Sequence, residues 1–261
     1  MLKNAHRLLS LTTAALIAST SLAAAEPSAE LIAAAKKEGA LTTIALPHSW
    51  CGYGDVIAGF KAKYGIEVNE LNPDASSGDE IEAIKANKGN TGPQAPDVID
   101  VGLSFGPSAK KEGLIQPYKV STWDSIPDDA KDAEGYWYGD YYGVLSFIVN
   151  TDIVKNVPKD WKDLTRPDVK VVVVNPKTGG NGRYTYLAAW GSVREAGGTD
   201  AQAQEFVKQL YKNVPVLGKG GRDATAIFLQ RNIGDVLITF ESEVVSVDRE
   251  FGKGKVDAVH P

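Results

Sequence analysis

A run of β-branched residues that leads through a glycine-rich turn into a helical segment constrains this chain most. Residues 169–174 read VKVVVV, residues 175–183 read NPKTGGNGR, and the YTYLAAWGSVREAGG that follows has helical spacing. Valine favours strands, whereas a glycine-rich turn before a helix leaves backbone N–H groups without intrahelical acceptors. The partial charges of these groups and the helix dipole favour an anion, so the turn predicts an anion-binding site.

Strand-like and helix-like segments alternate along the rest of the chain. Strands are expected at 40–46, 66–71, 97–102, 141–149, 169–174, 214–217, 235–240 and 256–260. Helices are expected at 29–37, 56–64, 77–87, 161–164, 183–196, 200–211, 224–230 and 243–251. This alternation indicates an α/β fold with mainly parallel sheets. The polar stretch 117–137 lacks periodicity and is expected to be a surface loop or crossover.

The first 25 residues have the composition of a secretory signal peptide. Lys3 and Arg7 precede an apolar run over 8–22, and an AAA sequence ending at Ala25 fits a cleavage site of small residues. Serine and threonine interrupt the apolar run, which is shorter than the ~20 residues of a membrane span. We therefore expect cleavage after Ala25 and export to the periplasm rather than a membrane anchor.

The net charge and the cysteine content narrow the possible partners and kinds of site further. Loss of Lys3 and Arg7 with the signal peptide would take the formal net charge from −5 to −7. An acidic protein is a poor partner for nucleic acid or anionic membrane. Cys51 is the only cysteine, which excludes an internal disulfide and a cysteine-based metal cluster, and it lies too far from Ala25 to carry a lipid.

Ligands of open α/β sheets bind at the carboxyl ends of strands, so the turns after strands supply the candidate site. From these turns and the strand end at 240 we take Ser49, Ser77, Gly78, Ser104, Thr178 and Phe240, with Arg183 and Arg222 as sources of positive potential. Each has a structural alternative, because Ser77 could simply cap a helix and the arginines could be solvated or paired with acids. Several glycine-bearing helix starts at one sheet edge nevertheless favour a small oxyanion.

Two rival functions have weaker support from the residues. The chain lacks the G-x-S-x-G, H-E-x-x-H and P-loop patterns, and no visible motif orients His48, Ser49 and Cys51 for catalysis. We expect no enzyme activity and no cofactor. A ferric site would draw on phenolates, with His48 and Glu241 to complete it. Its candidate phenolates are Tyr141, Tyr142, Tyr184 and Tyr186. We expect no metal site.

From about residue 163 the chain resembles the periplasmic sulfate-binding proteins of ABC importers. NPKTGGNGRYTYLAAWG is similar to the N-P-K-[ST]-S-G-x-A-R signature of that family, and YKNVPVLGKGGRDATAIFLQRNIGDVLITFESE follows its order and spacing. The earlier stretches ALTTIALPHSW, NPDASSGDEIEAI and GYWYGDYYGVLSFIVNTDIV resemble extracellular solute-binding proteins of family 1, whose ligands include iron and polyamines.

The resemblance implies a type II periplasmic-binding-protein fold with two α/β lobes. The first lobe would cover 26–118, the crossover and hinge 119–148, and the second lobe 149–261, with the C-terminal part of the fold truncated. Carried over by position, the residues that hold an oxyanion would be Gly179, Gly180, Asn181, Asp223 or Ala224, Ser77 and Gly78. Gly179 replaces a serine of the signature, and Phe240 replaces an indole donor.

The function that this resemblance implies is transport. The protein would capture a small oxyanion such as sulfate by hinge closure and deliver it, as a monomer, to a permease in the inner membrane. Ferric iron and an organic solute such as a polyamine are the alternative ligands.

Overall fold

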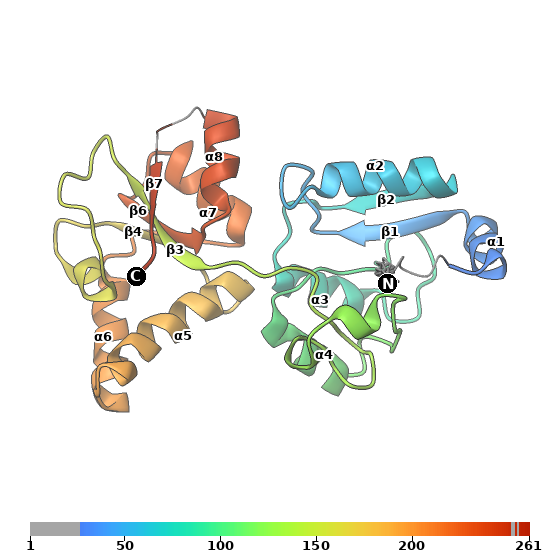
Figure 1. Cartoon of the computed structure of the whole chain (residues 1–261), viewed down its shortest axis with the longest axis horizontal. Helices are drawn as coiled ribbons and strands as arrows, with labels where there is room; N and C mark the ends of the chain where they lie inside the picture. Colours follow the sequence, from blue (N-terminus) through green and yellow to red (C-terminus); the bar gives the residue numbers. More distant parts are fainter. Residues whose placement is uncertain (1–26, 252–253, 255) are drawn as a thin grey trace, which may run out of the picture.

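The computed structural model describes residues 27–251, 254 and 256–261, and the chain forms two lobes (Figure 1). The expected signal peptide and its cleavage site lie outside the described residues. Among the residues described, no helix has the length and apolar character needed to cross a membrane.

The first lobe contains a small parallel sheet surrounded by helices. Its elements are α1 (Ala29–Glu38), β1 (Ala40–Ile44), α2 (Tyr53–Tyr64), β2 (Glu67–Leu71), α3 (Ser77–Ala86), η1 (Leu103–Phe105), α4 (Gly106–Lys111), η2 (Trp123–Ser125) and η3 (Asp128–Ala130). β1 and β2 pair in parallel, with Leu41 opposite Val68. Two small apolar clusters, one around Ile57 and one around Phe105, form the core of this lobe.

The prediction of a strand at 97–102 is wrong. Only one parallel bridge forms there, between Thr43 and Val98. The Asp97 carboxylate accepts a hydrogen bond from the Thr42 amide at 2.8 Å, so a side chain takes the place of a ladder bond beside β1. This segment is therefore an extended chain that follows the sheet edge without completing a third strand.

The second lobe is built on a five-stranded mixed sheet in the order β5-β4-β6-β3-β7. Its elements are β3 (Leu145–Asn150), η4 (Trp161–Thr165), β4 (Val171–Val174), α5 (Gly180–Glu195), α6 (Asp200–Lys212), β5 (Leu217–Gly218), α7 (Gly221–Leu229), β6 (Val236–Phe240), α8 (Glu243–Phe251) and β7 (Val256–Val259). β4 runs parallel to β5 and β6, whereas β3 runs antiparallel to β6 and β7. The expectation of mainly parallel pairing thus fails only at β3.

The valine run shows why this sheet is covered on both faces. Val171 and Val173 pack into a cluster with residues of α5 and α6, whereas Val172 and Val174 pack with residues of α7 and α8. Successive strand side chains point to opposite faces, so a strand of four valines requires apolar cover on both sides. Figure 1 shows α5 and α6 on one side of the sheet and α7 and α8 on the other.

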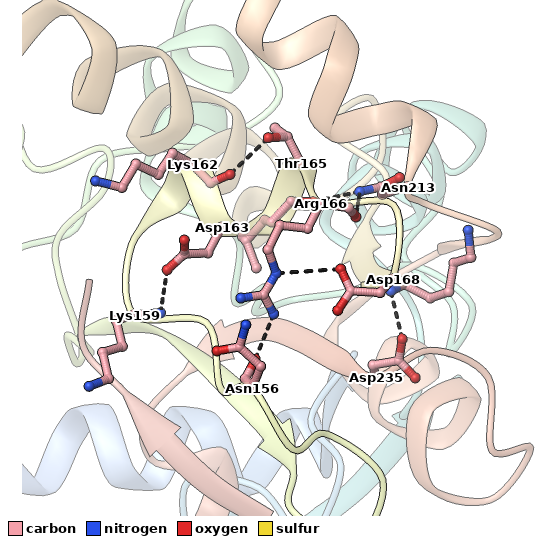
Figure 2. A network of polar contacts seen from close by, with 11 residues as sticks. Asn156, Lys159, Lys162, Asp163, Thr165, Arg166, Asp168, Asn213 and Asp235 are labelled. Carbon is pink, nitrogen blue, oxygen red and sulfur yellow. Dashed lines mark hydrogen bonds and ion pairs between the residues drawn. The ribbon is translucent and has the colours of Figure 1, made fainter.

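A polar network fixes the loop that leads from η4 to β4 (Figure 2). Asn213 donates from its amide to the carbonyl oxygens of Leu164 and Arg166 at 2.8 and 2.7 Å. Arg166 in turn donates to the Asn156 carbonyl at 2.6 Å, and the Lys170 amide donates to Asp235 at 2.7 Å. These bonds satisfy backbone groups where the chain turns into the buried strand.

The chain passes between the lobes once within the described residues, just before β3 (Figure 1). The strand expected at 141–149 begins only at Leu145, and Gly143 of the preceding stretch lies against Phe240. Much of the expected crossover packs on the first lobe, where Lys110 bonds Asp132 at 2.7 Å. We therefore propose that the crossing itself is the short stretch 141–144.

Candidate functional site

Three helices begin at the face where the lobes meet. α3 follows Ser76, whose hydroxyl accepts from the Asp79 amide at 3.3 Å while the Asp79 carboxylate accepts from the Ser76 amide at 2.9 Å. α5 follows Gly179 and α7 follows Gly220, and a glycine cap supplies no side-chain acceptor. The first N–H groups of α5 and α7 therefore depend on other partners, such as a ligand.

The three helix starts converge across the lobe boundary. The Gly78 amide of α3 donates to the Thr178 carbonyl, which precedes α5, at 2.8 Å. A Cβ on Gly102 would lie only 2.6 Å from the Gly180 Cα, and one on Gly220 would lie 3.6 Å from the Ser76 Cα. Glycine at 102 and 180 therefore permits a backbone approach that any side chain would prevent.

A cavity of about 1510 Å³ opens beside these helix starts and is lined from both lobes. Residues of the first lobe and of the crossing that face it include Ser49, Trp50, Tyr53, Ser77, Glu80, Asp100, Asp140 and Tyr141. Residues of the second lobe that face it include Gly179, Gly180, Asn181, Tyr184, Gly221, Arg222, Thr239, Phe240 and Glu243. Most of the lining residues belong to the first lobe and the crossing, and the starts of α5 and α7 and the end of β6 line the cavity from the second lobe.

The structure brings part of the expected site to this cavity. The expected residues that line it are Ser49, Ser77, Gly179, Gly180, Asn181, Arg222 and Phe240. The expected residues outside its lining are Gly78, Ser104, Thr178, Arg183, Asp223 and Ala224. At α7 the lining lies earlier than expected, at Gly220, Gly221 and Arg222, because the helix begins at Gly221 rather than near Ala224.

The expected residues outside the lining have protein partners. Thr178 donates from its hydroxyl to the Lys219 carbonyl at 2.7 Å, and the Asp223 carboxylate accepts from the Lys219 amide at 2.8 Å. Arg183 donates to the Ser104 hydroxyl at 3.0 Å. Ala224 is buried in the apolar cluster on the face of the sheet that α7 and α8 cover. These side chains shape the turns and the lobe boundary.

Two of the lining residues are also tied to the protein. The Asn181 amide nitrogen donates to the Thr239 hydroxyl at 3.0 Å, and its oxygen accepts from Thr185 at 3.3 Å. The Ser77 hydroxyl accepts from the Gly102 amide at 3.2 Å. These bonds orient both side chains within the cavity lining.

Sequence reasoning missed a carboxylate cluster at the same cavity. Tyr53 and Tyr141 donate to one oxygen of Asp100 at 2.7 and 3.1 Å, and Tyr53 also lies 3.3 Å from an Asp140 oxygen. Burial raises the pKa of Asp100, and the two phenol hydrogen bonds oppose that rise. Burial also raises the pKa of both phenols above their usual value. Both tyrosines are therefore neutral hydrogen-bond donors rather than phenolates.

Glu80 is the most deeply buried acid at the cavity. It is only 1% exposed, and one oxygen of its carboxyl group accepts from the Asp100 amide at 2.9 Å. Burial raises its pKa to about 9, although the hydrogen bond from the Asp100 amide opposes the rise. The group is therefore protonated at neutral pH and adds no negative charge beside the start of α3.

The groups considered for catalysis and for iron have other environments. His48 lies 2.5 Å from a Glu70 oxygen, on an exposed face. Burial, with Asp100, Asp140 and Glu243 nearby, raises the pKa of Cys51 to about 11, which makes its thiol a weak nucleophile. In the part of the chain that the structure describes, no three His, Cys, Asp or Glu side chains form a group that could hold a metal ion.

Two α/β lobes with a shared cavity are the architecture of type II periplasmic binding proteins. The chain belongs to the bacterial extracellular solute-binding proteins, whose family model matches residues 94–231. It has the fold of the sulfate-binding protein SubI from Mycobacterium tuberculosis, with a TM-score of 0.61 and 25% identity. That match covers 85% of this chain and 70% of SubI.

Curated relatives agree on the class of ligand. A thiosulfate-binding protein from Pseudomonas aeruginosa is 39% identical over 90% of this chain and 69% of its own length. A sulfate-binding protein from Salmonella typhimurium is 36% identical over 71% of this chain and 55% of its own length. The matches therefore cover 69% and 55% of the lengths of these two relatives. These relatives are binding proteins, not enzymes.

Proposed function

We propose that this chain is the periplasmic substrate-binding component of an ABC importer for a small sulfur oxyanion, with sulfate and thiosulfate as the leading ligands. The observation that carries the proposal is the convergence of three helix starts from two lobes on one cavity. The names of the relatives point to the same ligand class. The expected signal peptide supports the location, and a membrane permease is the partner that such a protein serves.

Binding requires no covalent step. A dehydrated oxyanion would accept hydrogen bonds from the N–H groups at Gly180, Asn181 and Gly221, with the dipoles of α5 and α7 adding favourable potential. Ser77 would contribute from the first lobe. Because one ligand then touches both lobes, it binds the closed form more tightly and shifts the population toward closure. The closed form is the one that would dock on the permease.

Two positions limit how many bonds the anion can receive. Gly179 offers no hydroxyl, and Phe240 offers no indole N–H where the resemblance places these donors. The Phe240 ring also packs against Gly143 of the crossing stretch. A polar ligand atom that loses a buried hydrogen bond costs about 1–3 kcal/mol. We therefore expect the site to favour the anion that needs the fewest hydrogen bonds from side chains.

A second candidate ligand is an organic amine, and the carboxylates favour it. Asp100 and Asp140 face the cavity, and Glu243 reaches it from α8. Ionised carboxylates weaken the binding of a dianion and would attract an ammonium group.

The first experiment is a thermal-shift and calorimetry screen of the purified chain without its signal peptide. The panel contains sulfate, thiosulfate, phosphate, spermidine and ferric citrate. A ligand bound only by the native state raises the melting temperature by mass action. Sulfate or thiosulfate should raise it at millimolar concentration. A shift with spermidine alone, or a visible tyrosinate band with iron, would contradict the proposal.

The second experiment places a charge at the site. An added Cβ at Gly221 meets no atom within 4 Å, so Gly221→Asp fits the fold, and an acid in the first turn favours a helix. We expect Gly221→Asp to weaken sulfate binding at least roughly a hundredfold, because like charges brought together cost several kcal/mol. Ala201→Asp, in the exposed first turn of α6, is the matched control and should leave affinity unchanged.

Gly221→Asp and a further variant, Asp100→Asn, together separate the two candidate ligands. If an amine is the ligand, Gly221→Asp should not weaken binding, whereas Asp100→Asn should. If an oxyanion is the ligand, Asp100→Asn should strengthen binding or leave it unchanged. Equal sulfate affinity for Gly221→Asp and the unmodified chain would place the anion elsewhere and refute the site.

A further inference from the structure

Two side chains of α3 hold the extended segment 97–102 against the first turn of that helix. The Ser77 hydroxyl accepts from the Gly102 amide at 3.2 Å, and one oxygen of the Glu80 carboxyl group accepts from the Asp100 amide at 2.9 Å. Residues three apart are neighbours on one helix face, and amides two apart point to the same side of an extended chain. The Ser77 and Glu80 side chains therefore lie next to each other, and both residues line the cavity.

The same segment connects this pair of side chains with the start of α5. Gly102, which bonds Ser77, approaches Gly180 so closely that a Cβ on Gly102 would lie 2.6 Å from the Gly180 Cα. Glu80 bonds the residue two positions before Gly102, and two residues of extended chain span about 7 Å. The Glu80 carboxyl group therefore lies on the side of the cavity where the first lobe meets α5, whose N–H groups are proposed to hold the oxyanion.

Each of the two side chains keeps one polar group that pairs with no protein atom. The bonds to the segment use an oxygen as acceptor, so the proton of the Ser77 hydroxyl has no acceptor among the described residues. The second oxygen of the Glu80 carboxyl group likewise has no hydrogen-bond partner in that part of the chain. A buried polar group without a partner costs free energy, so a ligand atom that pairs with it is favoured.

Most of the charged groups around Glu80 are acids. Asp79 is its neighbour on α3, and Asp100 is its partner on the extended segment. The phenols that bond Asp100 are those of Tyr53 and Tyr141. The other charged residues that line the cavity are Asp97 and Asp140 from the first lobe and the crossing, and Arg222 and Glu243 from the second lobe.

These surroundings keep the Glu80 carboxyl group protonated. Burial raises its pKa, and the charges of Asp100 and Asp79 add to that rise. The hydrogen bond from the Asp100 amide opposes the rise, whereas no lysine or arginine among the described residues lowers the pKa further. A protonated carboxyl group has an O–H donor, so Glu80 can donate a hydrogen bond at neutral pH.

We propose that Glu80 acts as a neutral acid in the binding site, and that its carboxyl O–H donates to the bound oxyanion beside the Ser77 hydroxyl. This inference rests on the proposed function, because it assigns a further residue to the same site. An ionised Glu80 would repel the anion and would have no proton to donate. The form of the chain that binds the ligand is therefore the form that holds this proton.

The first test is the affinity for thiosulfate between about pH 7 and about pH 10, measured by calorimetry. Thiosulfate is fully ionised throughout this range, so any change comes from the protein. Affinity scales with the fraction of protein in the competent form, and the pKa of Glu80 is about 9. The unmodified chain should therefore bind about tenfold more weakly at the upper end of the range. In Glu80→Gln, whose amide keeps an N–H donor at every pH, the affinity should change less than about twofold.

Binding should also take up protons at alkaline pH. At a pH equal to its pKa of about 9, half of the Glu80 carboxyl groups are ionised, and each must regain a proton before it can donate. Calorimetry in two buffers with different enthalpies of ionisation should therefore give an uptake of about half a proton per thiosulfate bound. Glu80→Gln should take up none. The matched control is Glu82→Gln, exposed on the same helix, and it should behave like the unmodified chain.

A third variant, Glu80→Met, distinguishes a hydrogen-bond donor from a group that is merely neutral. Methionine has a similar length and no polar hydrogen, so this variant should bind thiosulfate about tenfold more weakly than Glu80→Gln at every pH. Equal affinities of the two variants would show that only the absence of charge matters, which would overturn the donor role. If circular dichroism shows that Glu80→Met does not fold, the pH profile and the proton uptake decide the proposal without it.

The same measurements separate this proposal from the proposed function. If thiosulfate binds the unmodified chain and Glu80→Gln with the same pH profile and the same proton uptake, the assignment of Glu80 fails and the proposed function stands. If neither thiosulfate nor sulfate binds the unmodified chain at any pH, both fail.

Discussion

Glu80 is the residue at which burial and charge conflict most strongly. Its pKa of about 9 in the folded protein lies far above the 4.5 of an exposed glutamate. Between these values the unfolded chain releases a proton that the folded chain retains, so stability falls as pH rises. The contribution of Glu80 to the free energy of unfolding is fully present below about pH 4.5, and it is lost as the pH rises to about 9.

Glu80→Gln should therefore stabilise the protein at alkaline pH. The amide keeps an acceptor for the Asp100 amide and removes the cost of ionising a buried acid. We expect a gain of about 1–3 kcal/mol at pH 8 that shrinks below pH 5, measured by urea unfolding. Glu82→Gln, exposed on the same helix, is the control. A variant destabilised equally at both pH values would contradict this account.

Cys51 should react slowly despite its exposure. Although the residue is exposed, partial desolvation of the sulfur and the nearby carboxylates raise its pKa to about 11, so little thiolate exists at pH 8. Alkylation by iodoacetamide should be roughly a hundredfold slower in the folded chain than in urea. Mass spectrometry of timed samples measures both rates. Equal rates would mean that desolvation and the nearby carboxylates do not raise the pKa of the thiol.

At the scale of elements, α3 and α6 begin with the same capping box but in different places. Ser76 and Asp79 cap α3 at the lobe boundary, whereas Thr199 and Gln202 cap α6 far from the cavity. Each cap satisfies backbone donors reciprocally. Comparing variants of these two capping boxes distinguishes the effect of a cap on stability from its effect on ligand binding.

Ser76→Ala and Thr199→Ala should each lower stability by about 1 kcal/mol. Only Ser76→Ala should also weaken thiosulfate binding, because Ser76 caps the start of α3 where that helix lines the cavity. Thermal unfolding and calorimetry measure the two effects. If Thr199→Ala weakened binding as much as Ser76→Ala, the loss would reflect general destabilisation and not the site.

Local patterns in the sequence predicted most elements and missed those that depend on distant contacts. The valine run and the glycine turn after it gave β4 and the start of α5, although α5 begins at Gly180 rather than 183. The expected strand at 97–102 did not form, since Asp97 caps the edge of β1 through its side chain. Periodicity cannot register such a bond, because its partners are 55 residues apart.

The same limit applied to the site. Glycine-rich helix starts are visible in sequence, so Gly180 and Asn181 were predicted, and both line the cavity. Asp100 was missed because its partners, Tyr53 and Tyr141, are 47 and 41 residues away. Arg183 was expected to face the anion, and its contact with Phe105 arises only when the lobes meet.

At the scale of the whole molecule, the two lobes differ in how much core they contain. The second lobe buries most residues of β3, β4 and β6 completely, between helices on both faces. The first lobe has a two-stranded sheet and two small clusters. The free energy of local unfolding is lower where few apolar contacts are buried, so the lobe with the smaller core should unfold locally first.

Hydrogen exchange should therefore divide the molecule into two parts. Without ligand, amides of β4 and β6 should be at least about tenfold better protected than those of β1 and β2. Thiosulfate should slow exchange at the starts of α3, α5 and α7 together, because one ligand and the closed interface order both lobes. In Gly221→Asp the same addition should change nothing. Slowing confined to the second lobe would show that the anion binds α5 and α7 without closing the protein.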